Sequence, residues 1–349
     1  MRTLIARLDS AGDVLLAGPT VRAAAASSAW VTLLCGPQGA AAARLLPGVD
    51  DVIVWDAPWV GLEPPPVRAD DIAAITASLA DRRLDRALIL TSFHQSPLPT
   101  ALLLRLAGVG WIGADSVDYP GSLLDLRHQR GDDRHEADAA LDLARAAGFA
   151  LPSNDDGRLA ITAPPNVTGL TGPEPYVVVH PGAAVPARAP GFGTAVEITT
   201  ALLQAGHRVV LTGGPGETAL TSSVAYRTGA LDLGGRTDLH GLAGILAGAD
   251  AVVVGNTGPA HLAAAVGTPV VSLFAPVVPA QRWAPYRVPS VVLGDQRAAC
   301  RDTRARTCPI PGHPCLTSIR GEDVLAAVDG LIPRVKKRPA PQNTREVTA

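Results

Sequence analysis

The stretch AVVVGNTGPAHLAAAVGTPVVSLFAP, residues 251–276, decides the fold expected for this chain. It opens with a short apolar run rich in branched side chains, which is typical of a buried parallel strand. A turn with two glycines and a threonine follows, and a helix of small residues is predicted over 259–266. Residues 267–269 end that helix, and residues 270–274 form another buried strand. The pattern indicates a strand–helix–strand unit of an open α/β sheet.

The turn between this strand and its helix has the chemistry of an anion site. Free backbone N–H groups and the positive end of a helix dipole converge where a parallel strand ends and a helix begins. In an open α/β sheet the natural anion at that edge is a nucleotide phosphate. Taken alone, the turn fits a packing role with an exposed histidine equally well. The candidate binding residues are Asn256, Thr257, Gly258, Pro259 and His261.

The composition indicates a globular protein of two domains. The 349 residues are enough for two ordinary domains, and 47% of them are apolar. A net charge of -2 gives no basic surface for nucleic acid. Four unevenly spaced cysteines fit a reducing cytoplasm better than a disulfide scaffold. Charge within the first apolar run argues against a signal peptide, and no apolar stretch reaches spanning length, so we expect a cytoplasmic protein.

Strands and helices alternate in both halves of the chain, which predicts parallel sheets covered on both faces. Residues 151–175 are rich in Pro, Gly, Asn and Asp, as is typical of a domain boundary. We therefore expect an α/β protein with Rossmann-like domains over 1–165 and 172–333, facing a central cleft that holds the ligand. The polar tail over 334–349 is expected to be disordered.

Asp13 follows the predicted first strand, residues 3–8, and stands at the sheet edge where α/β proteins place their sites. It also enters a helix predicted over 14–26, and an aspartate at a helix N-cap is common for structural reasons alone. Both roles stay open on these residues by themselves. Asp9, four residues earlier, has the same ambiguity and a weaker position.

Two further turns in the second half carry glycines at strand ends. HPGAA at 180–184 precedes an arginine, whose fork of donors suits a diphosphate. TGGPGE at 212–217 ends in a glutamate that fits either a ribose contact or a helix cap. Three such turns in one half indicate a nucleotide site, although each alone is weak evidence. The residues concerned are Gly182, Ala183, Arg188, Gly213, Gly214 and Glu217.

Several common motifs are absent from the sequence. No GxGxxG follows the first strand, which argues against a nicotinamide or flavin enzyme, and no GxxxxGK[ST] loop is present. No aspartates are spaced D-x-D, so helix ends and cationic side chains would neutralise a diphosphate without a metal. Cys300, Cys308 and Cys315 with His313 have spacings unlike those of compact zinc modules, and we interpret this segment as a loop with free thiols, with metal binding left open.

At these turns the chain resembles the glycosyltransferase family 9 enzymes, the ADP-heptose:lipopolysaccharide heptosyltransferases. The resemblance covers about residues 1–332, and its most specific block is Asn-Thr-Gly-Pro-Ala-His at 256–261. The segments that follow the family pattern are LIARLDSAGDVLLAGPTVRA at 4–23, HPGA at 180–183, GGPGE at 213–217, residues 233–276, and CPIPGHPCL at 308–316.

The resemblance implies a GT-B fold with the acceptor on the first domain and the nucleotide-sugar on the second. It also implies an inverting, metal-independent transfer that needs no cofactor. By this analogy Asp13 is the general base that takes the proton of the acceptor hydroxyl, with Ser10 and Gly12 on the acceptor side. On the donor side the analogy implies contacts from Arg188 to the diphosphate, from Glu217 to the nucleoside, and from Thr257, Gly258 and His261 to the phosphates and sugar.

Two departures from the family pattern concern specificity. Asn256 stands where the family usually has aspartate, so a charge near the donor sugar is lost. The HPGA turn continues with alanine where a hydroxyl residue is often found, and its basic residue is an arginine in place of lysine. These changes point to a different sugar or to an acceptor other than lipopolysaccharide.

The expected partners are a nucleotide-sugar, ADP-linked by the resemblance, and a glycan, glycolipid or small-molecule acceptor. A glycolipid acceptor would bring the protein to the inner membrane face as a peripheral protein. Two other functions stay open on the sequence. One is a GT-B-shaped sugar-nucleotide 2-epimerase or hydrolase, which needs no acceptor. The other is a sugar-nucleotide-binding protein without catalysis, in which Asp13 would only cap a helix.

Overall fold

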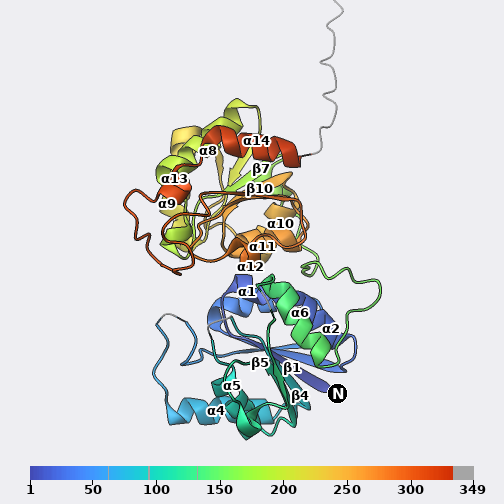
Figure 1. Cartoon of the computed structure of the whole chain (residues 1–349). Coiled ribbons are helices and arrows are strands. Elements are labelled where there is room, and N and C mark those ends of the chain that lie inside the picture. Colours follow the sequence, from blue (N-terminus) through green and yellow to red (C-terminus); the bar gives the residue numbers. More distant parts are fainter. Residues whose placement is uncertain (62, 93–94, 132, 333–349) are drawn as a thin grey trace, which may run out of the picture.

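The computed structural model describes residues 1–332 except 62, 93–94 and 132. Figure 1 shows two bodies, one above the other, joined at one side by a long connection that includes the segment expected as a linker. Each body is built around one sheet of parallel strands. The tail predicted to be disordered, 334–349, lies outside the described residues.

The first sheet has the strand order β3-β2-β1-β4-β5-β6. The central strand β1 pairs with β2 on one side and β4 on the other, so the direction of winding reverses there. The strands are β1 (Arg2–Arg7), β2 (Trp30–Cys35), β3 (Asp51–Val54), β4 (Arg86–Ile89), β5 (Trp111–Asp115) and β6 (Leu126–His128). The helices of this part are α1 (Ala11–Leu16), α2 (Gly18–Ala25), α3 (Ala40–Ala43), α4 (Ala69–Ala80), α5 (Leu98–Leu106) and α6 (Glu136–Ala146), with 3₁₀ turns η1 (Pro37–Gly39) and η2 (Gly121–Leu123).

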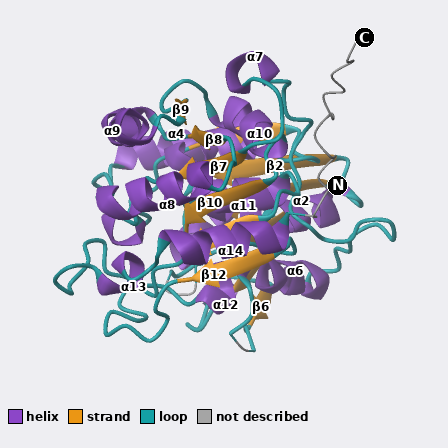
Figure 2. Ribbon diagram, turned by 90° about the horizontal axis from the view of Figure 1, so that it is seen from above, coloured by secondary structure: helices purple, strands orange, loops and turns teal. Residues whose placement is uncertain are grey.

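The second sheet repeats this winding, in the order β12-β11-β10-β7-β8-β9. Figure 2 shows that order from β9 at one edge, through β7 and β10, to β12 at the other. The strands are β7 (Val177–His180), β8 (Val209–Leu211), β9 (Leu231–Asp232), β10 (Ala251–Gly255), β11 (Val270–Leu273) and β12 (Ser290–Leu293). The helices are α7 (Thr168–Thr171), α8 (Phe192–Gln204), α9 (Thr218–Thr228), α10 (Leu239–Ala247), α11 (Gly258–Ala265), α12 (Ala280–Trp283), α13 (Pro314–Thr317) and α14 (Gly321–Leu331), with 3₁₀ turns η3 (Pro186–Arg188) and η4 (Pro215–Glu217).

The helix predicted over 14–26 is in fact two helices. α1 ends at Leu16, and α2 begins at Gly18 with Pro19 in its first turn, where a missing N–H is tolerated but cannot continue the bonding of α1. The N-cap of α1 is Ser10, so Asp13 lies inside the first helical turn. Of the two roles left open for Asp13, the structure therefore does not show the helix N-cap.

The sequence pattern did not predict β5 and β6. β5 contains Gly113, and a Cβ there would lie 2.8 Å from the Trp111 ring, so the strand lacks the usual branched side chain at that position. β6 has only three residues at the sheet edge, all of them partly or fully exposed, and it shows no apolar run. Packing against β4 and β5, not local propensity, makes these segments strands.

The two bodies meet through helices at facing sheet edges. α1 and α11 lie at the boundary in Figure 1, and one apolar core continues from Val14 and Leu15 of α1 to Ala260 and Leu262 of α11. A second contact joins the start of α6 to the segment after α12, where Tyr286 donates to Asp138 and His135 bonds to the Ala284 carbonyl. These contacts fix how the two sheet edges face each other.

Candidate functional site

The site lies where the amino ends of α1 and α11 meet. Gly12 and Gly258 make this contact: a Cβ on Gly12 would lie 3.2 Å from the Gly258 Cα and 3.0 Å from the His261 Cδ2. A side chain on Gly12 would crowd both groups, so glycine favours this approach. The contact brings Asp13 of the first body next to His261 of the second, and it puts two positive helix ends in one place.

The Asp13 carboxylate is held by two donors. Arg7 Nη2 donates to one oxygen at 3.0 Å, and Ser10 Oγ donates to the other at 2.8 Å. Burial opposes ionisation of Asp13, but the charge of Arg7 and the bond from Ser10 outweigh it, so the pKa of Asp13 is lowered. Its side chain is 19% exposed. Asp13 is thus an ionised carboxylate that a ligand can still reach.

His261 is a neutral imidazole at neutral pH. Burial, reinforced by the nearby His135, lowers the pKa of His261 to about 4, although Asp13 acts in the opposite direction. Its Nδ1 is buried and, within the described chain, has no hydrogen-bond partner. A buried polar atom of this kind is expected to find its partner in a ligand or water.

Arg188 lies in η3, after the glycine turn that follows β7. Its Nη1 approaches the Asn256 carbonyl at 3.5 Å, and its buried Nε has no hydrogen-bond partner among the described residues. Burial lowers the pKa of Arg188, and Asp13 partly offsets this. The guanidinium therefore keeps unused donors at the edge where β7 and β10 end.

Glu217 occupies the space above the first glycine turn. Its Oε2 accepts from the Gly214 N–H at 2.7 Å and lies 3.4 Å from His180 Nε2. The hydrogen bond with His180 lowers the pKa of Glu217 despite partial burial. A Cβ on Gly182 would lie only 2.1 Å from Glu217 Oε1, so Gly182 is needed for this arrangement. Of the two roles considered for Glu217, the structure shows the cap, made at η4.

Asn256 is buried and fully occupied by the backbone. Its Nδ2 donates to the Ala275 carbonyl at 3.3 Å, and its Oδ1 accepts from the Ala275 N–H at 3.1 Å. The side chain therefore ties the end of β10 to Ala275, two residues beyond β11. Thr257 is the N-cap of α11 and makes no side-chain capping bond, and Pro259 is in its first turn. Ala183 and Gly213 are partly exposed in their turns.

Sequence reasoning missed Arg7 as a member of this site, and it named Asp9 only as a weaker candidate than Asp13. Arg7 is buried in β1 and contacts both Asp13 and Asp9, with the Asp9 carboxylate 3.0 Å from its Nε. The one available signal was an arginine inside an otherwise apolar strand. From the sequence we used that charge only to argue against a signal peptide, and not to place Arg7 in the site.

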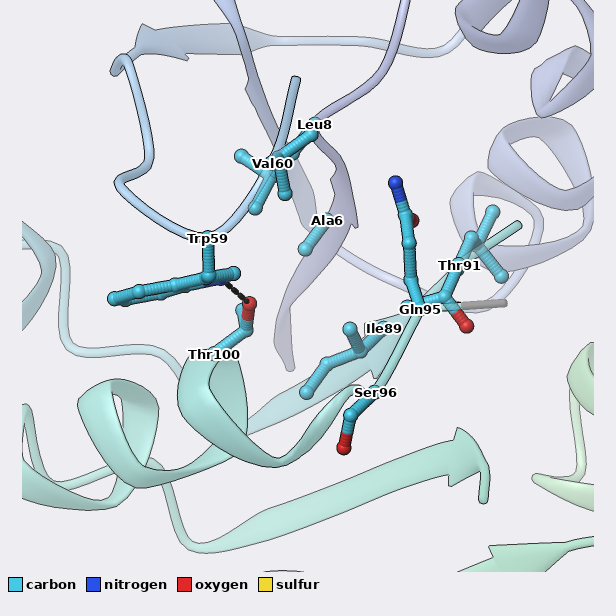
Figure 3. Close-up of a pocket in the computed structure, with 10 residues that line it drawn as sticks. Ala6, Leu8, Trp59, Val60, Ile89, Thr91, Gln95, Ser96 and Thr100 are labelled. Atoms are coloured by element: carbon cyan, nitrogen blue, oxygen red, sulfur yellow. Dashed lines mark hydrogen bonds between the residues drawn. The ribbon is translucent and has the colours of Figure 1, made fainter. Parts of the chain in front are cut away.

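A narrow hollow adjoins this side of the site (Figure 3). Trp59 and Val60, from the loop after β3, line it together with Leu8 and Gln95. Trp59 Nε1 donates to Thr100 Oγ1 at 3.1 Å, which fixes the ring. The free volume of about 10 Å³ is room for one water molecule.

The cysteine segment contacts the site through His313, whose Nε2 bonds to the carbonyl of Ala187 at 3.1 Å, next to Arg188. Cys300 and Cys315 are buried, Cys308 is partly exposed, and all three are free thiols. Among the described residues, no group of three histidine, cysteine or carboxylate side chains is arranged to hold a metal ion. No helix in the described ranges is both long and apolar enough to cross a bilayer.

Residues 72–313 match the model of glycosyltransferase family 9 (heptosyltransferase), which is more than half of the chain. The chain belongs to this family. It is therefore a glycosyltransferase, as its motifs indicated. No curated protein matches it by sequence.

Solved structures similar to this family 9 chain share its fold. A glycosyltransferase family 9 protein from Veillonella parvula is 18% identical with a TM-score of 0.76, covering 95% of this chain and 96% of that one. E. coli ADP-heptose lps heptosyltransferase II is 19% identical with a TM-score of 0.71, covering 95% and 98%. E. coli heptosyltransferase WaaC with ADP-2-deoxy-2-fluoro heptose is 20% identical with a TM-score of 0.68, covering 95% and 99%. The GT-B fold is thus confirmed.

Proposed function

We propose that this family 9 enzyme transfers heptose from ADP-heptose to a hydroxyl group of a glycan, glycolipid or small-molecule acceptor, with inversion at the anomeric carbon and without a metal ion. The observation that carries the proposal is the contact of α1 with α11, which sets an ionised carboxylate against a neutral, partly unpaired imidazole. The similar WaaC structure, with a fluorinated ADP-heptose, supports the choice of donor.

In the proposed reaction Asp13 acts as the general base. Its carboxylate takes the proton of the acceptor hydroxyl while that oxygen forms a bond to the anomeric carbon. The bond from the anomeric carbon to the phosphate oxygen breaks on the opposite face, and ADP leaves with the electron pair. An ionised, partly exposed carboxylate suits this role because it is in the proton-accepting form at neutral pH.

The leaving diphosphate needs preorganised donors. Arg188 supplies unused N–H groups, and the amino end of α11 supplies the Gly258 backbone donor with the helix dipole. Gly182 leaves the space that the Glu217 carboxylate occupies in the neighbouring turn. This set supports a transfer in which protein groups, and not a metal, stabilise the leaving group.

Calorimetry tests the nucleotide assignment. We expect ADP to bind more tightly than UDP, GDP or dTDP, and an Arg188→Gln variant to weaken ADP binding by roughly tenfold, since a charge-assisted contact is lost. Equal affinity for all four nucleotides would contradict the ADP assignment.

Asp13→Asn tests the base. ADP release from ADP-heptose, measured with a panel of sugar acceptors, should fall by about 10²- to 10⁴-fold, while ADP binding stays unchanged. Unchanged turnover in this variant would reject Asp13 as base. Activity of the native enzyme in EDTA should be retained, and its complete loss would reject the metal-independent mechanism.

A further inference from the structure

Asp13 shares its arginine with a second carboxylate. Arg7 Nη2 donates to Asp13 Oδ1 at 3.0 Å and to Ser92 Oγ at 3.1 Å. Arg7 Nε lies 3.0 Å from Asp9 Oδ2, although these two atoms are not aligned for a hydrogen bond. One buried guanidinium thus faces two carboxylates whose side chains are only 12% and 19% exposed.

The Asp9 carboxylate is fixed from its other side as well. Gln95 Nε2 donates to Asp9 Oδ1 at 2.6 Å. Burial of Asp9 and repulsion from Asp13 raise the pKa of Asp9, while Arg7 and Gln95 act in the opposite direction. The two carboxylates therefore differ in acidity, a pattern found where an enzyme separates the roles of paired acids.

An arginine normally binds a carboxylate through two parallel N–H donors. Here Asp9 stands at Nε, so Asp13 receives one bond from Nη2 alone. Without Asp9, the fork of Arg7 would be free to close on Asp13. A carboxylate held by both donors is a weaker base, because each bond stabilises its ionised form.

We propose that Asp9 is a positioning residue for the transfer reaction, which occupies one edge of the Arg7 guanidinium and so keeps Asp13 basic enough to accept a proton. This inference rests on the proposed role of Asp13 as base. In this proposal the Arg7–Asp9 pair does more than hold β1 in place. The pair sets the proton affinity of the Asp13 carboxylate.

The charged groups around Asp13 all enter this balance. Arg7 from β1 and Arg188 from η3 interact with Asp13 as cations. His261 of α11 is neutral at neutral pH, and Ser10 supplies a hydrogen bond. Glu136 of α6 acts on Arg7 and Asp9. Besides Asp13, the carboxylates of Asp9 and Glu136 act on Arg7. Of these two, only Asp9 forms an ion pair with Arg7.

Carbon-13 NMR of the full chain labelled at the aspartate carboxyl carbon tests this directly. The resonance missing from Asp13→Asn identifies Asp13, and its titration midpoint is then followed in Asp9→Asn. We expect the midpoint to move down by about one pH unit, since a like charge is removed and Arg7 can bind Asp13 fully. ADP release from ADP-heptose at neutral pH should be roughly threefold slower, and the acid limb of its pH profile should move the same way.

The matched control is Asp155→Asn, which removes a carboxylate paired with Arg22 at 2.6 Å. It should leave the Asp13 midpoint and the pH profile unchanged. If Asp9→Asn does not fold, as judged by circular dichroism, Asp9→Ser replaces it. A midpoint that stays fixed, or moves up, overturns the inference. Full activity of Asp13→Asn would overturn the proposed function instead, so the two failures are distinguishable.

Discussion

At the scale of single residues, Asn256 shows how an amide differs from the carboxylate expected by family resemblance. Its NH₂ group donates to the Ala275 carbonyl and its oxygen accepts from the Ala275 N–H, so both halves of the amide are needed. A carboxylate reproduces only the second bond. Asn256, whose difference from the family aspartate pointed to a different sugar, thus also holds the ends of two strands together.

We therefore expect Asn256→Asp to lower the free energy of unfolding by about 2 kcal/mol, because a buried carbonyl loses its donor and a charge is buried. Urea denaturation measures this. Asn166→Asp is the matched control, since the exposed Asn166 uses only its oxygen, which accepts from Thr168. That control should stay within roughly 0.5 kcal/mol of the native protein. Equal losses in both variants would contradict the account.

At the scale of elements, the glycine turns after β7 and β8 pack against each other. The turn after β7 and the turn after β8 touch through Glu217, whose carboxylate lies against Gly182 and accepts from Gly214. Neither turn forms the contact between Gly182 and Glu217 alone, because these two residues are more than thirty positions apart in the sequence. The strand order, with β7 beside β8, brings them together.

Gly182→Ala should displace the Glu217 carboxylate, because its new Cβ would lie 2.1 Å from Oε1. If Glu217 contacts the nucleoside as the resemblance implies, its displacement removes a charge-assisted bond to ADP, and we expect the ADP affinity measured by calorimetry to fall by about tenfold. Gly216→Ala, in the turn after β8 and with open space around its Cβ, should change the affinity less than twofold. A native affinity in Gly182→Ala would show that ADP does not depend on this contact.

At the scale of the whole molecule, the site exists only because two bodies hold their sheet edges against each other. Besides the contact of α1 with α11, a buried carboxylate joins them: Glu136 pairs with Arg130 at 2.6 Å and with Arg282 of the other body at 3.4 Å. Arg282 also pairs with Asp133. This group fixes the start of α6 to α12, close to the reacting residues.

Glu136→Gln leaves two arginines without their shared charge in a nearly buried position. We expect the thermal midpoint of unfolding to fall by roughly 5–10 °C, corresponding to about 3 kcal/mol. Differential scanning calorimetry measures this. Asp70→Asn breaks the ion pair with Arg68, which is exposed on both sides, and should give no measurable change. A midpoint unchanged in Glu136→Gln would show that this pairing does not stabilise the molecule.

The sequence by itself determined the two α/β halves, the strand-end turns, the position of Asp13 at a sheet edge and the family. The halves, the turns and the position of Asp13 follow from periodicity and turn chemistry, which act over a few neighbouring residues, and the family follows from the resemblance of its motifs. Tertiary structure alone decided that Asn256 binds Ala275 and that Arg7 lies between Asp9 and Asp13. The hydrogen-bond partners of a buried charge or amide are the residues that pack against it. Those residues are distant in sequence, so local sequence patterns do not reveal them.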